Sequence, residues 1–405
     1  MKEMKRKILL TGGTGFVGSF LAHRLLQEGY EIKFLARPNK HQSAQQRIDD
    51  TLNFVKPSFL FKNQYEVIEG DITNHNLGMK ESDLTKLRGQ IDEVWHCAAF
   101  ISFREEDADK TYKINALGTK NVLEFMNIIE TKRLHYLSTA FVCGNRLGIV
   151  YEDELDCGQK FRNPYERTKF EAEKLVNEWK LKKEIESTIY RLGIVVGESH
   201  SGKTLNYFGY YEFMKSFYDI RKKVEKQLLE YSKCYSEKGI VEMNDKLKIP
   251  VRVPCNLQSE INLITIDFAI DIISQLAFKM ESKGKTFHVI NQNAPVFKWL
   301  FETSTKFLGL TGLKLIDIKK NAYLSILLSR SRIIGLLKKM LLREMELNIL
   351  NECGQYLPYA LGEPKFDDSN VKAILGNVAH PLITEEQIST LLSYAIKTEF
   401  GRISV

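Results

Sequence analysis

The chain has 405 residues, of which 43% are hydrophobic, enough to build a sizeable α/β core with a smaller region appended. Its net charge of +7 is scattered over the sequence without a compact basic block, so we expect no nucleic-acid partner. The six cysteines form no Cys-x-x-Cys pair and stand at no zinc-ligand spacing with a histidine, so we expect free thiols and no metal. No run of about 18–20 apolar residues is present, which favours a cytoplasmic protein.

A glycine-rich loop follows the first predicted strand, Lys7–Thr11, and opens a predicted helix, Val17–Glu28. A helix that begins directly after such a loop presents free backbone N–H groups and the positive end of its dipole to a pyrophosphate. Glycines at this spacing permit a tight turn, close approach of the backbone to phosphate, and close packing of the helix on the strand. The candidate residues for binding a dinucleotide here are Thr11, Gly12, Gly15, Phe16, Val17 and Gly18.

Arg37 stands directly after the second predicted strand, Glu31–Ala36. Dinucleotide folds that bind NAD carry an acidic residue at this point to hold the ribose hydroxyls, whereas a guanidinium can bind a 2′-phosphate through two parallel hydrogen bonds. Arg37 therefore favours NADP(H) over NAD(H) as the cofactor. The alternative is an arginine that is merely solvated after a strand.

The next two predicted strands, Tyr65–Gly70 and Glu93–Cys97, also end beside candidate cofactor-binding residues. Asp71 could accept a hydrogen bond from the adenine amino group while Ile72 covers the ring, or Asp71 could instead cap the following turn. The small residues that would let a cofactor lie close to the backbone after the second of these strands are Ala98 and Ala99.

The pair Tyr165 and Lys169 carries the most specific catalytic signal. Its i, i+4 spacing on a predicted helix, Pro164–Lys183, places the phenol and the ammonium on one face. A free phenol has a pKa near 10, and a neighbouring ammonium lowers this pKa toward the range that suits acid–base catalysis at neutral pH. The position of the pair, about 150 residues after the glycine loop, makes it more specific than the pattern alone.

Hydroxyl and amide side chains complete the predicted catalytic set. Ser138 and Thr139 end the fifth predicted strand, Arg133–Thr139, where a hydroxyl can hold a substrate carbonyl over the nicotinamide. Asn115 lies in a predicted helix, Thr111–Ile129, and its amide could bind backbone or water in a proton relay. As isolated residues, such side chains are more often simple structural caps.

Alternation of strands and helices up to about residue 200 predicts a Rossmann-like, doubly wound parallel sheet whose strand ends form a ligand crevice along one edge. We expect an NADP-binding domain over 1–205, with a sixth strand at Ser187–Arg191. A substrate-binding region is expected over 206–295, with a late strand at Thr286–Asn291 that returns to the core domain. The remainder, 296–405, is expected to be a helical C-terminal region.

Two segments outside the expected cofactor domain leave alternatives open. The aromatic residues around Tyr207–Phe217 could line an apolar substrate pocket or pack within a core. The basic, leucine-rich segment 322–350 could rest on a membrane surface or an acyl carrier, or it could form a helical cap on the main domain.

Together these motifs resemble the extended short-chain dehydrogenase/reductase superfamily over about residues 5–295. The resemblance implies that Tyr165 donates a proton, that Tyr165 and Lys169 both contact the cofactor, and that Lys169 does so at the nicotinamide ribose. It also implies that Thr139, with Ser138 beside it, orients the carbonyl, and that Asn115 belongs to the catalytic set. The segment 191–197 is similar to the superfamily's Arg-Pro-Gly-x-x-x-Gly, with leucine in place of proline, and implies cofactor contacts from Leu192 and Ile194.

Within the superfamily, the sequence is similar to the NAD-binding domains of fatty acyl-CoA reductases and thioester reductases of the male-sterility type. The similar segments are 11–18, 34–37, 115–119, 138–142 and 262–267. This resemblance implies NADPH-dependent reduction of an apolar acyl thioester to an aldehyde, and sometimes onward to an alcohol. It implies CoA or an acyl carrier protein as the carrier of the acyl group, and extended members of the superfamily often form homodimers.

Three other functions remain open at this point. The same catalytic residues would suit a dehydrogenase of a hydroxylated lipid or sterol-like substrate. A nucleotide-sugar epimerase or dehydratase would need a basic grip on a diphosphate in the 200–300 region, where Arg252 is available among aromatic residues. A non-catalytic NADP-binding protein is disfavoured by the intact Thr139, Tyr165 and Lys169.

Overall fold

The computed structural model describes residues 6–56, 61, 63–237, 239–317 and 354–403. The chain divides into two compact units. The first contains Met1–Val195, Ile264–Asn291 and Lys365–His380, and the second contains Val196–Leu263, Gln292–Pro364 and Pro381–Val405.

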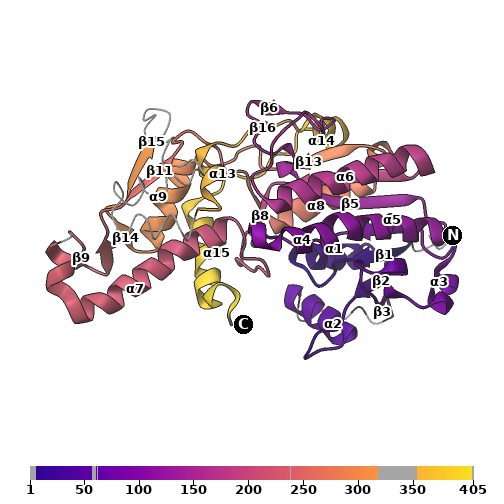
Figure 1. Cartoon of the computed structure of the whole chain (residues 1–405), viewed down its shortest axis with the longest axis horizontal. Coiled ribbons are helices and arrows are strands. Elements are labelled where there is room, and N and C mark those ends of the chain that lie inside the picture. The colour runs from indigo at the N-terminus through magenta and orange to yellow at the C-terminus, as the bar shows by residue number, and fades with distance from the viewer. Residues whose placement is uncertain (1–5, 57–60, 62, 238, 318–353, 404–405) are drawn as a thin grey trace. The chain divides into compact units, whose positions relative to one another are not determined.

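A seven-stranded parallel sheet forms the centre of the first unit (Figure 1). Its strands are β1 (Lys7–Thr11), β2 (Glu31–Ala36), β3 (Tyr65–Glu69), β4 (Glu93–His96), β5 (Arg133–Thr139), β7 (Glu186–Leu192) and β13 (Thr286–Val289). They lie in the order β13-β7-β5-β4-β1-β2-β3, and every neighbouring pair is parallel. In chain order the strands β1 to β3 extend to one side of β1, and β4 and the later strands lie on its other side. In sheets of this type, ligands bind at such a switch point, outside the carboxyl ends of the strands, here β1 and β4. The predicted Rossmann-like fold is confirmed.

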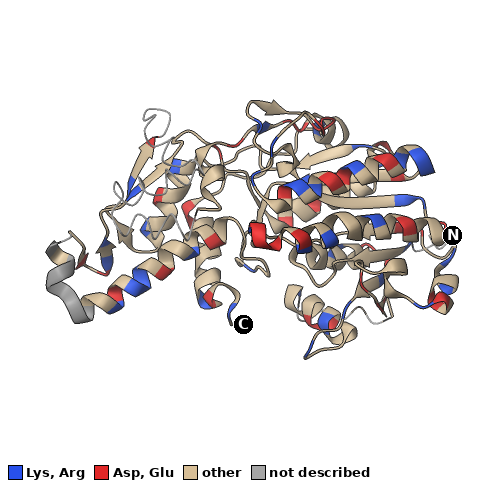
Figure 2. Ribbon diagram, in the orientation of Figure 1, with Lys and Arg blue, Asp and Glu red and all other residues tan. Residues whose placement is uncertain are grey.

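Helices cover both faces of this sheet, because successive side chains of each buried strand point to opposite faces. In β1, Ile8 and Leu10 join one hydrophobic core and Leu9 joins the other. The first core includes residues of α1 (Phe16–Gln27), α2 (Ala44–Val55) and α8 (Ile266–Ala277). The second includes residues of α3 (Glu81–Leu87), α5 (Gly118–Ile128) and α6 (Pro164–Lys183). Figure 2 shows charged residues of both signs along α6, as expected for a helix with one solvated face.

A π-helical turn at Lys113–Leu117 interrupts the helix that the sequence predicts over Thr111–Ile129. The turn joins α4 (Ala108–Tyr112) to α5, and Asn115 is buried within it. Such turns are rare and occur frequently at functional sites, because they re-aim side chains that a regular helix would place elsewhere.

The boundaries of the first unit differ from the expected domain 1–205. It ends at Val195 and also takes in 365–380, which lay in the expected C-terminal region. In that segment, β16 (Lys365–Phe366) pairs with β6 (Ile149–Val150), and α14 (Ser369–Leu375) follows. The buried Glu152 carboxylate joins the segment to the sheet by accepting hydrogen bonds from the amides of His288 and Asn370, at 2.8 and 2.5 Å. The strand β8 (Ile194–Val196) pairs with β12 (Leu263–Thr265), where the chain leaves and re-enters the first unit.

The second unit mixes helices with short strands, so the region expected to be helical over 296–405 also contributes strands. Its described helices are α7 (Tyr210–Glu237), α9 (Phe297–Phe307), α13 (Leu357–Leu361) and α15 (Glu385–Lys397). One small sheet contains β9 (Val241–Met243), β10 (Lys246–Lys248) and β14 (Leu310–Thr311), and another pairs β11 (Arg252–Cys255) with β15 (Lys314–Asp317).

The aromatic residues at the start of α7 pack within the core of the second unit. The ring centroids of Phe213 and Phe217 lie 5.3 Å apart, and the ring of Phe217 lies 5.2 Å from that of Phe301 on α9. Tyr210 shares a hydrogen bond of 2.8 Å with Ser304 of α9. Of the two alternatives for this segment, core packing is the one observed for these side chains.

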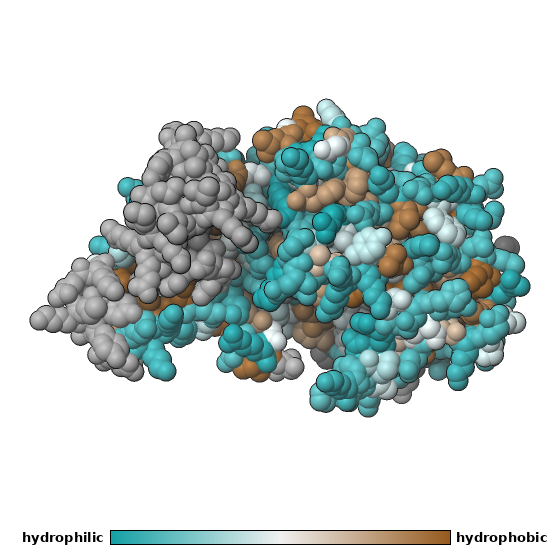
Figure 3. All heavy atoms as spheres, viewed as in Figure 1, coloured by the Kyte–Doolittle hydropathy of each residue, from teal (hydrophilic) through white to brown (hydrophobic). Residues whose placement is uncertain are grey.

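The basic segment 322–350 lies outside the described residues. Among the helices that the structure describes, none is long and apolar enough to cross a bilayer. Hydrophilic residues cover most of the first unit on the face seen in Figure 3, with small apolar patches between them.

Candidate active site

The glycine-rich loop takes a conformation that only glycine permits at two positions. Gly12 has a φ of +78°, and a Cβ there would come within 2.5 Å of the Ala98 nitrogen. A Cβ on Gly18 would lie 2.2 Å from the Gly12 carbonyl oxygen, so this glycine lets α1 pack against the loop. The loop is closed by a hydrogen bond of 2.9 Å from the Gly15 amide to that same oxygen.

The start of α1 fits the pyrophosphate of a dinucleotide. Gly15 is the N-cap and has no side chain to cap the first turn, and the first turn carries no acidic residue. The backbone amides of Phe16 and Val17 therefore stand at the positive end of the helix dipole, while the Phe16 side chain is buried in the core. Thr11 is buried at the end of β1, and its hydroxyl accepts a 3.3 Å hydrogen bond from the Ala98 amide.

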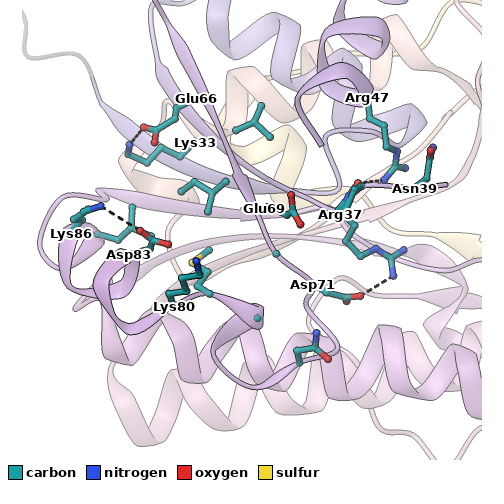
Figure 4. Close-up of a pocket in the computed structure, with 18 residues that line it drawn as sticks. Lys33, Arg37, Asn39, Arg47, Glu66, Glu69, Asp71, Lys80, Asp83 and Lys86 are labelled. Atoms are coloured by element: carbon teal, nitrogen blue, oxygen red, sulfur yellow. Dashed lines mark hydrogen bonds and ion pairs between the residues drawn. The ribbon is translucent and has the colours of Figure 1, made fainter. Parts of the chain in front are cut away.

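A cavity of about 1190 Å³ runs along the edge strand β3 and reaches the carboxyl ends of β2 and β3, where the predicted Arg37 and Asp71 line it (Figure 4). Arg37 Nη1 donates to Asp71 Oδ2 at 3.0 Å, and the Thr73 amide donates to Asp71 Oδ1 at 2.9 Å. Partial burial alone would raise the pKa of Asp71, but the Thr73 amide and Arg37 together lower it. Asp71 therefore caps the following turn and also orients Arg37.

Arg47 of α2 is a second cation at this site, and the sequence alone did not point to it. Its guanidinium donates to the Arg37 carbonyl oxygen at 2.6 Å (Figure 4). It also donates to the Thr14 hydroxyl at 3.3 Å. Partial burial and the neighbouring charge of Arg37 lower the pKa of Arg47. Two guanidinium groups, those of Arg37 and Arg47, therefore lie at this end of the cavity with the carboxylates of Glu69 and Asp71 and could bind an anionic group of a ligand.

The remaining predicted cofactor residues line the same edge of the sheet. Ile72 is buried, and its side chain would clash with any Cβ at Gly118, so it packs directly on the start of α5. Ala98 is half-buried and Ala99 is exposed after β4, which leaves their small side chains open to a ligand. Leu192 ends β7 and is buried, and Ile194 is half-buried in β8.

Tyr165 and Thr139 come together at the end of β5. Tyr165 is half-buried, and burial raises the pKa of its phenol, while a hydrogen bond with the Thr139 hydroxyl opposes that rise. The Thr139 hydroxyl is also placed by a 3.3 Å hydrogen bond from the Phe141 amide. Ser138 Oγ is buried, and within the described part of the chain it has no hydrogen-bond partner.

Lys169 is fully buried and is held by β5. Its ammonium donates to Tyr136 Oη at 2.6 Å and to the Leu137 carbonyl oxygen at 2.7 Å. Two of its three N–H groups are therefore used among the described residues, which leaves one for a ribose hydroxyl. Burial lowers the pKa of Lys169 to about 7, although the negative charge of Glu173 opposes the change.

The side chain of Asn115 binds the backbone, which is one of the two roles that the sequence left open for it. Its Oδ1 accepts from the Phe100 amide at 2.8 Å, and its Nδ2 donates to the Phe100 carbonyl oxygen at 3.0 Å. The same nitrogen lies 3.1 Å from the Thr168 hydroxyl, one residue before Lys169. Asn115 thus ties the segment after β4 to the helix that carries Lys169.

This sheet order, the glycine loop and the Tyr-x-x-x-Lys helix place the chain in the extended short-chain dehydrogenase/reductase class of NAD(P)-dependent oxidoreductases. A family model described as male sterility protein matches residues 10–273. The chain belongs to this family.

Curated relatives agree with this family, and solved structures share the fold. The chain is 30% identical over 165 residues to fatty acyl-CoA reductase 8 of Arabidopsis thaliana, covering 36% of this chain and 33% of that protein. It is 25% identical over 192 residues to the carboxylic acid reductase of Segniliparus rugosus, covering 43% of this chain and 16% of that protein. It is also 25% identical over 294 residues to a component of the linear gramicidin synthase of Brevibacillus parabrevis, covering 71% of this chain and 5% of that protein. The chain thus spans a third or less of these relatives.

The terminal R domain of the myxalamid PKS-NRPS pathway has the same fold, with a TM-score of 0.73 and 24% identity, over 99% of this chain and 92% of that one. The thiolation-reductase di-domain of an archaeal non-ribosomal peptide synthetase follows with a TM-score of 0.68 and 20% identity, over 98% and 76% of the two chains. UDP-glucuronic acid 4-epimerase of Bacillus cereus also shares the fold, with a TM-score of 0.60 and 18% identity, over 96% and 99%.

Proposed function

We propose that this protein reduces an apolar acyl thioester with NADPH, releasing an aldehyde or carrying it onward to an alcohol. The observation that carries the proposal is the placement of Thr139, Tyr165 and Lys169 at the same sheet edge as a loop shaped for a dinucleotide. Membership of the male sterility protein family supports the choice of a thioester over a sugar nucleotide or a hydroxylated lipid.

Bound NADPH would supply a hydride to the acyl carbon. The hydroxyls of Thr139 and Tyr165 stabilise the oxyanion that hydride addition leaves on the acyl oxygen, because they can donate hydrogen bonds to it. Collapse of the oxyanion breaks the carbon–sulfur bond and releases a thiolate and the aldehyde. When a second hydride reduces the aldehyde, the alkoxide takes the proton of Tyr165 and leaves as the alcohol.

The direction of the Tyr165 pKa suits an acid. Burial raises the pKa of Tyr165 above its ordinary value of about 10, so at neutral pH the phenol holds its proton. After the proton has been given up, the positive charge of Lys169 stabilises the phenolate that remains. Loss of activity at high pH is therefore assigned to Lys169, whose pKa is lowered, and not to Tyr165.

The preference for NADPH rests on Arg37 and Arg47. Replacing Arg47 with alanine should weaken NADPH binding about 10- to 100-fold, because a hydrogen bond between charged groups contributes about 1.5–3 kcal/mol. NADH binding should hardly change, because NADH lacks the 2′-phosphate. Dissociation constants for both cofactors, measured by the fluorescence of the reduced nicotinamide, test this.

The matched control is Lys86→Ala, which removes a cation from the opposite end of the same cavity, where Lys86 pairs with Asp83 (Figure 4). This variant should bind both cofactors as the parent protein does. If Arg47→Ala weakens NADPH and NADH equally, Arg47 supports the fold of the loop and does not select the cofactor.

The substrate is tested by following NADPH absorbance at 340 nm with long-chain acyl-CoAs, the same acyl chains on the phosphopantetheine arm of a carrier protein, and the free aldehydes. We expect oxidation of NADPH with at least one thioester, and faster turnover on the carrier if the acyl group is delivered by a protein. Turnover of aldehydes alone would make the protein a carbonyl reductase. Conversion of UDP-sugars into their epimers, followed by chromatography because epimerisation consumes no NADPH, would support the epimerase alternative.

A further inference from the structure

The Lys169 ammonium contacts both the hydroxyl oxygen and the ring of Tyr136 on β5. The Tyr136 hydroxyl oxygen accepts a hydrogen bond of 2.6 Å from Lys169 Nζ, and the same nitrogen lies 4.2 Å from the centroid of the Tyr136 ring. Both side chains are buried, at 2% exposure for Lys169 and 0% for Tyr136. A buried ammonium loses its hydration, so the phenol oxygen, the ring face and the Leu137 carbonyl replace the water that it would otherwise bind.

A buried hydrogen-bond network supports this arrangement. His96 of β4 lies with Nδ1 at 2.7 Å from the Thr11 hydroxyl and Nε2 at 3.0 Å from the Thr119 hydroxyl. Thr119 donates to the Asn115 carbonyl oxygen at 2.6 Å and also has a hydrogen-bonding interaction with the Tyr136 phenol. Burial and the charge of Lys169 lower the pKa of His96 to about 3, so this imidazole is neutral.

One assignment of donors satisfies the whole network. The Thr11 hydroxyl donates to His96 Nδ1, and the Nε2–H of His96 donates to Thr119, whose own proton goes to the Asn115 carbonyl. The Thr119 hydroxyl also interacts with the Tyr136 phenol and opposes the rise in the pKa that burial causes there, and the phenol oxygen accepts from Lys169. The glycine loop and the helix carrying Lys169 are thereby joined through the interior of the sheet.

We infer that Tyr136 is a positioning residue for Lys169, whose phenol oxygen and ring hold the ammonium charged and in place at the end of the crevice. This inference rests on the proposed function, because it takes Lys169 to act on the cofactor ribose and on Tyr165. It assigns a role in the reaction to a side chain that lies in the strand interior.

Several charged and titratable groups face Lys169. On its own helix α6 this group is Glu173, which is also paired with Arg191 of β7, whereas Tyr165 acts on the Tyr136 phenol. From β4 and the residue after it come the neutral His96 and the thiol of Cys97. None of these groups accepts a described hydrogen bond from the Lys169 ammonium, so Tyr136 supplies the side-chain oxygen that stabilises its charged form.

Tyr136→Phe removes that oxygen and keeps the ring. Loss of a hydrogen bond to an ammonium disfavours its charged form, so Lys169 should lose its proton at lower pH. The alkaline limb of kcat/KM should then move down by about one pH unit, since one pKa unit is about 1.4 kcal/mol. The dissociation constant of NADPH, measured against pH by fluorescence, should shift in the same direction without any turnover.

Tyr190→Phe is the matched control. Tyr190 is equally buried on the neighbouring β7, and its hydroxyl pairs with His135 Nδ1 at 2.9 Å, away from Lys169. This variant tests the cost of losing any buried phenol oxygen and should leave both pH profiles where they are in the parent protein. If Tyr136→Phe does not fold, Thr119→Val removes the hydroxyl that orients the phenol and should shift the same limb in the same direction.

The outcomes separate this inference from the proposed function. An alkaline limb that moves in Tyr136→Phe and stays in Tyr190→Phe supports the inference. The inference would be overturned if Tyr136→Phe leaves the alkaline limb unmoved in the pH profiles of both NADPH binding and turnover. If Tyr136→Phe does not fold, the same result with Thr119→Val would overturn it. The parent protein could reduce no thioester while the pH dependence of NADPH affinity still moves down in Tyr136→Phe. In that case the proposed function fails and the positioning role of Tyr136 stands.

Discussion

Tyr165→Phe should lower kcat for aldehyde reduction about 10²- to 10⁴-fold, which is the contribution expected of a positioned general acid. The substitution keeps the ring and removes only the proton donor beside Thr139. NADPH affinity should stay near that of the parent protein, because the described contacts that position the glycine loop, Arg37 and Arg47 do not involve the Tyr165 phenol. Thioester reduction should also slow, since one of the two oxyanion donors is lost.

Tyr112→Phe is the control for this variant. Tyr112 lies on α4 and is 44% exposed, so loss of its hydroxyl should leave both kcat and NADPH affinity unchanged. Stopped-flow measurement of NADPH oxidation under single-turnover conditions separates the chemical step from product release. Full aldehyde reduction by Tyr165→Phe would show that another group supplies the proton.

Glu173→Gln should cost about 3–5 kcal/mol of stability, because it leaves a buried arginine without its counter-charge. Arg191 Nη2 lies 2.8 Å from Glu173 Oε2, its Nε lies 3.1 Å from both carboxylate oxygens, and both side chains are at most 2% exposed. The pair joins α6 to β7 behind the catalytic residues. Urea unfolding, followed by tyrosine and tryptophan fluorescence, measures the change.

The same variant should alter Lys169. The charge of Glu173 raises the pKa of Lys169 against the effect of burial, so Glu173→Gln should lower this pKa further and move the alkaline limb of activity down. Glu178→Gln is the control on the same helix, because its exposed pair with Lys182 contributes little. If Glu173→Gln and Glu178→Gln unfold at the same urea concentration, the buried pair between Glu173 and Arg191 does not stabilise the fold as proposed.

The sheet could be predicted because each of its strands carries its own local signal. Lys7–Thr11, Glu31–Ala36 and Arg133–Thr139 have the bounds that their apolar runs and flanking turns indicate, and the α6 helix spans Pro164–Lys183 as predicted. The glycine loop could also be predicted, because a Cβ at Gly12 or Gly18 would clash with the neighbouring backbone. The fold therefore requires glycine at these positions, and the requirement is visible in the sequence.

Features that depend on distant parts of the chain could not be read in the same way. The return of 365–380 to the first unit depends on Glu152, more than two hundred residues earlier, and no local pattern signals that pairing. Arg47 looks like one charge among many on an amphipathic helix until the fold brings it to Thr14 and Arg37. Tyr136 reads as an ordinary core residue of a buried strand, and only its contact with Lys169 distinguishes it.

The central claim, hydride transfer to the acyl carbon of a thioester, is tested most directly with NADPH that carries deuterium at the transferred position. The parent protein is incubated with this cofactor and a long-chain acyl thioester, and the products are analysed by mass spectrometry. We predict an aldehyde with one deuterium on the former acyl carbon, or an alcohol with two, and much less of either product with Tyr165→Phe at the same time points. Thioester consumed to the free acid, or NADPH consumed without deuterium on that carbon, would contradict the account.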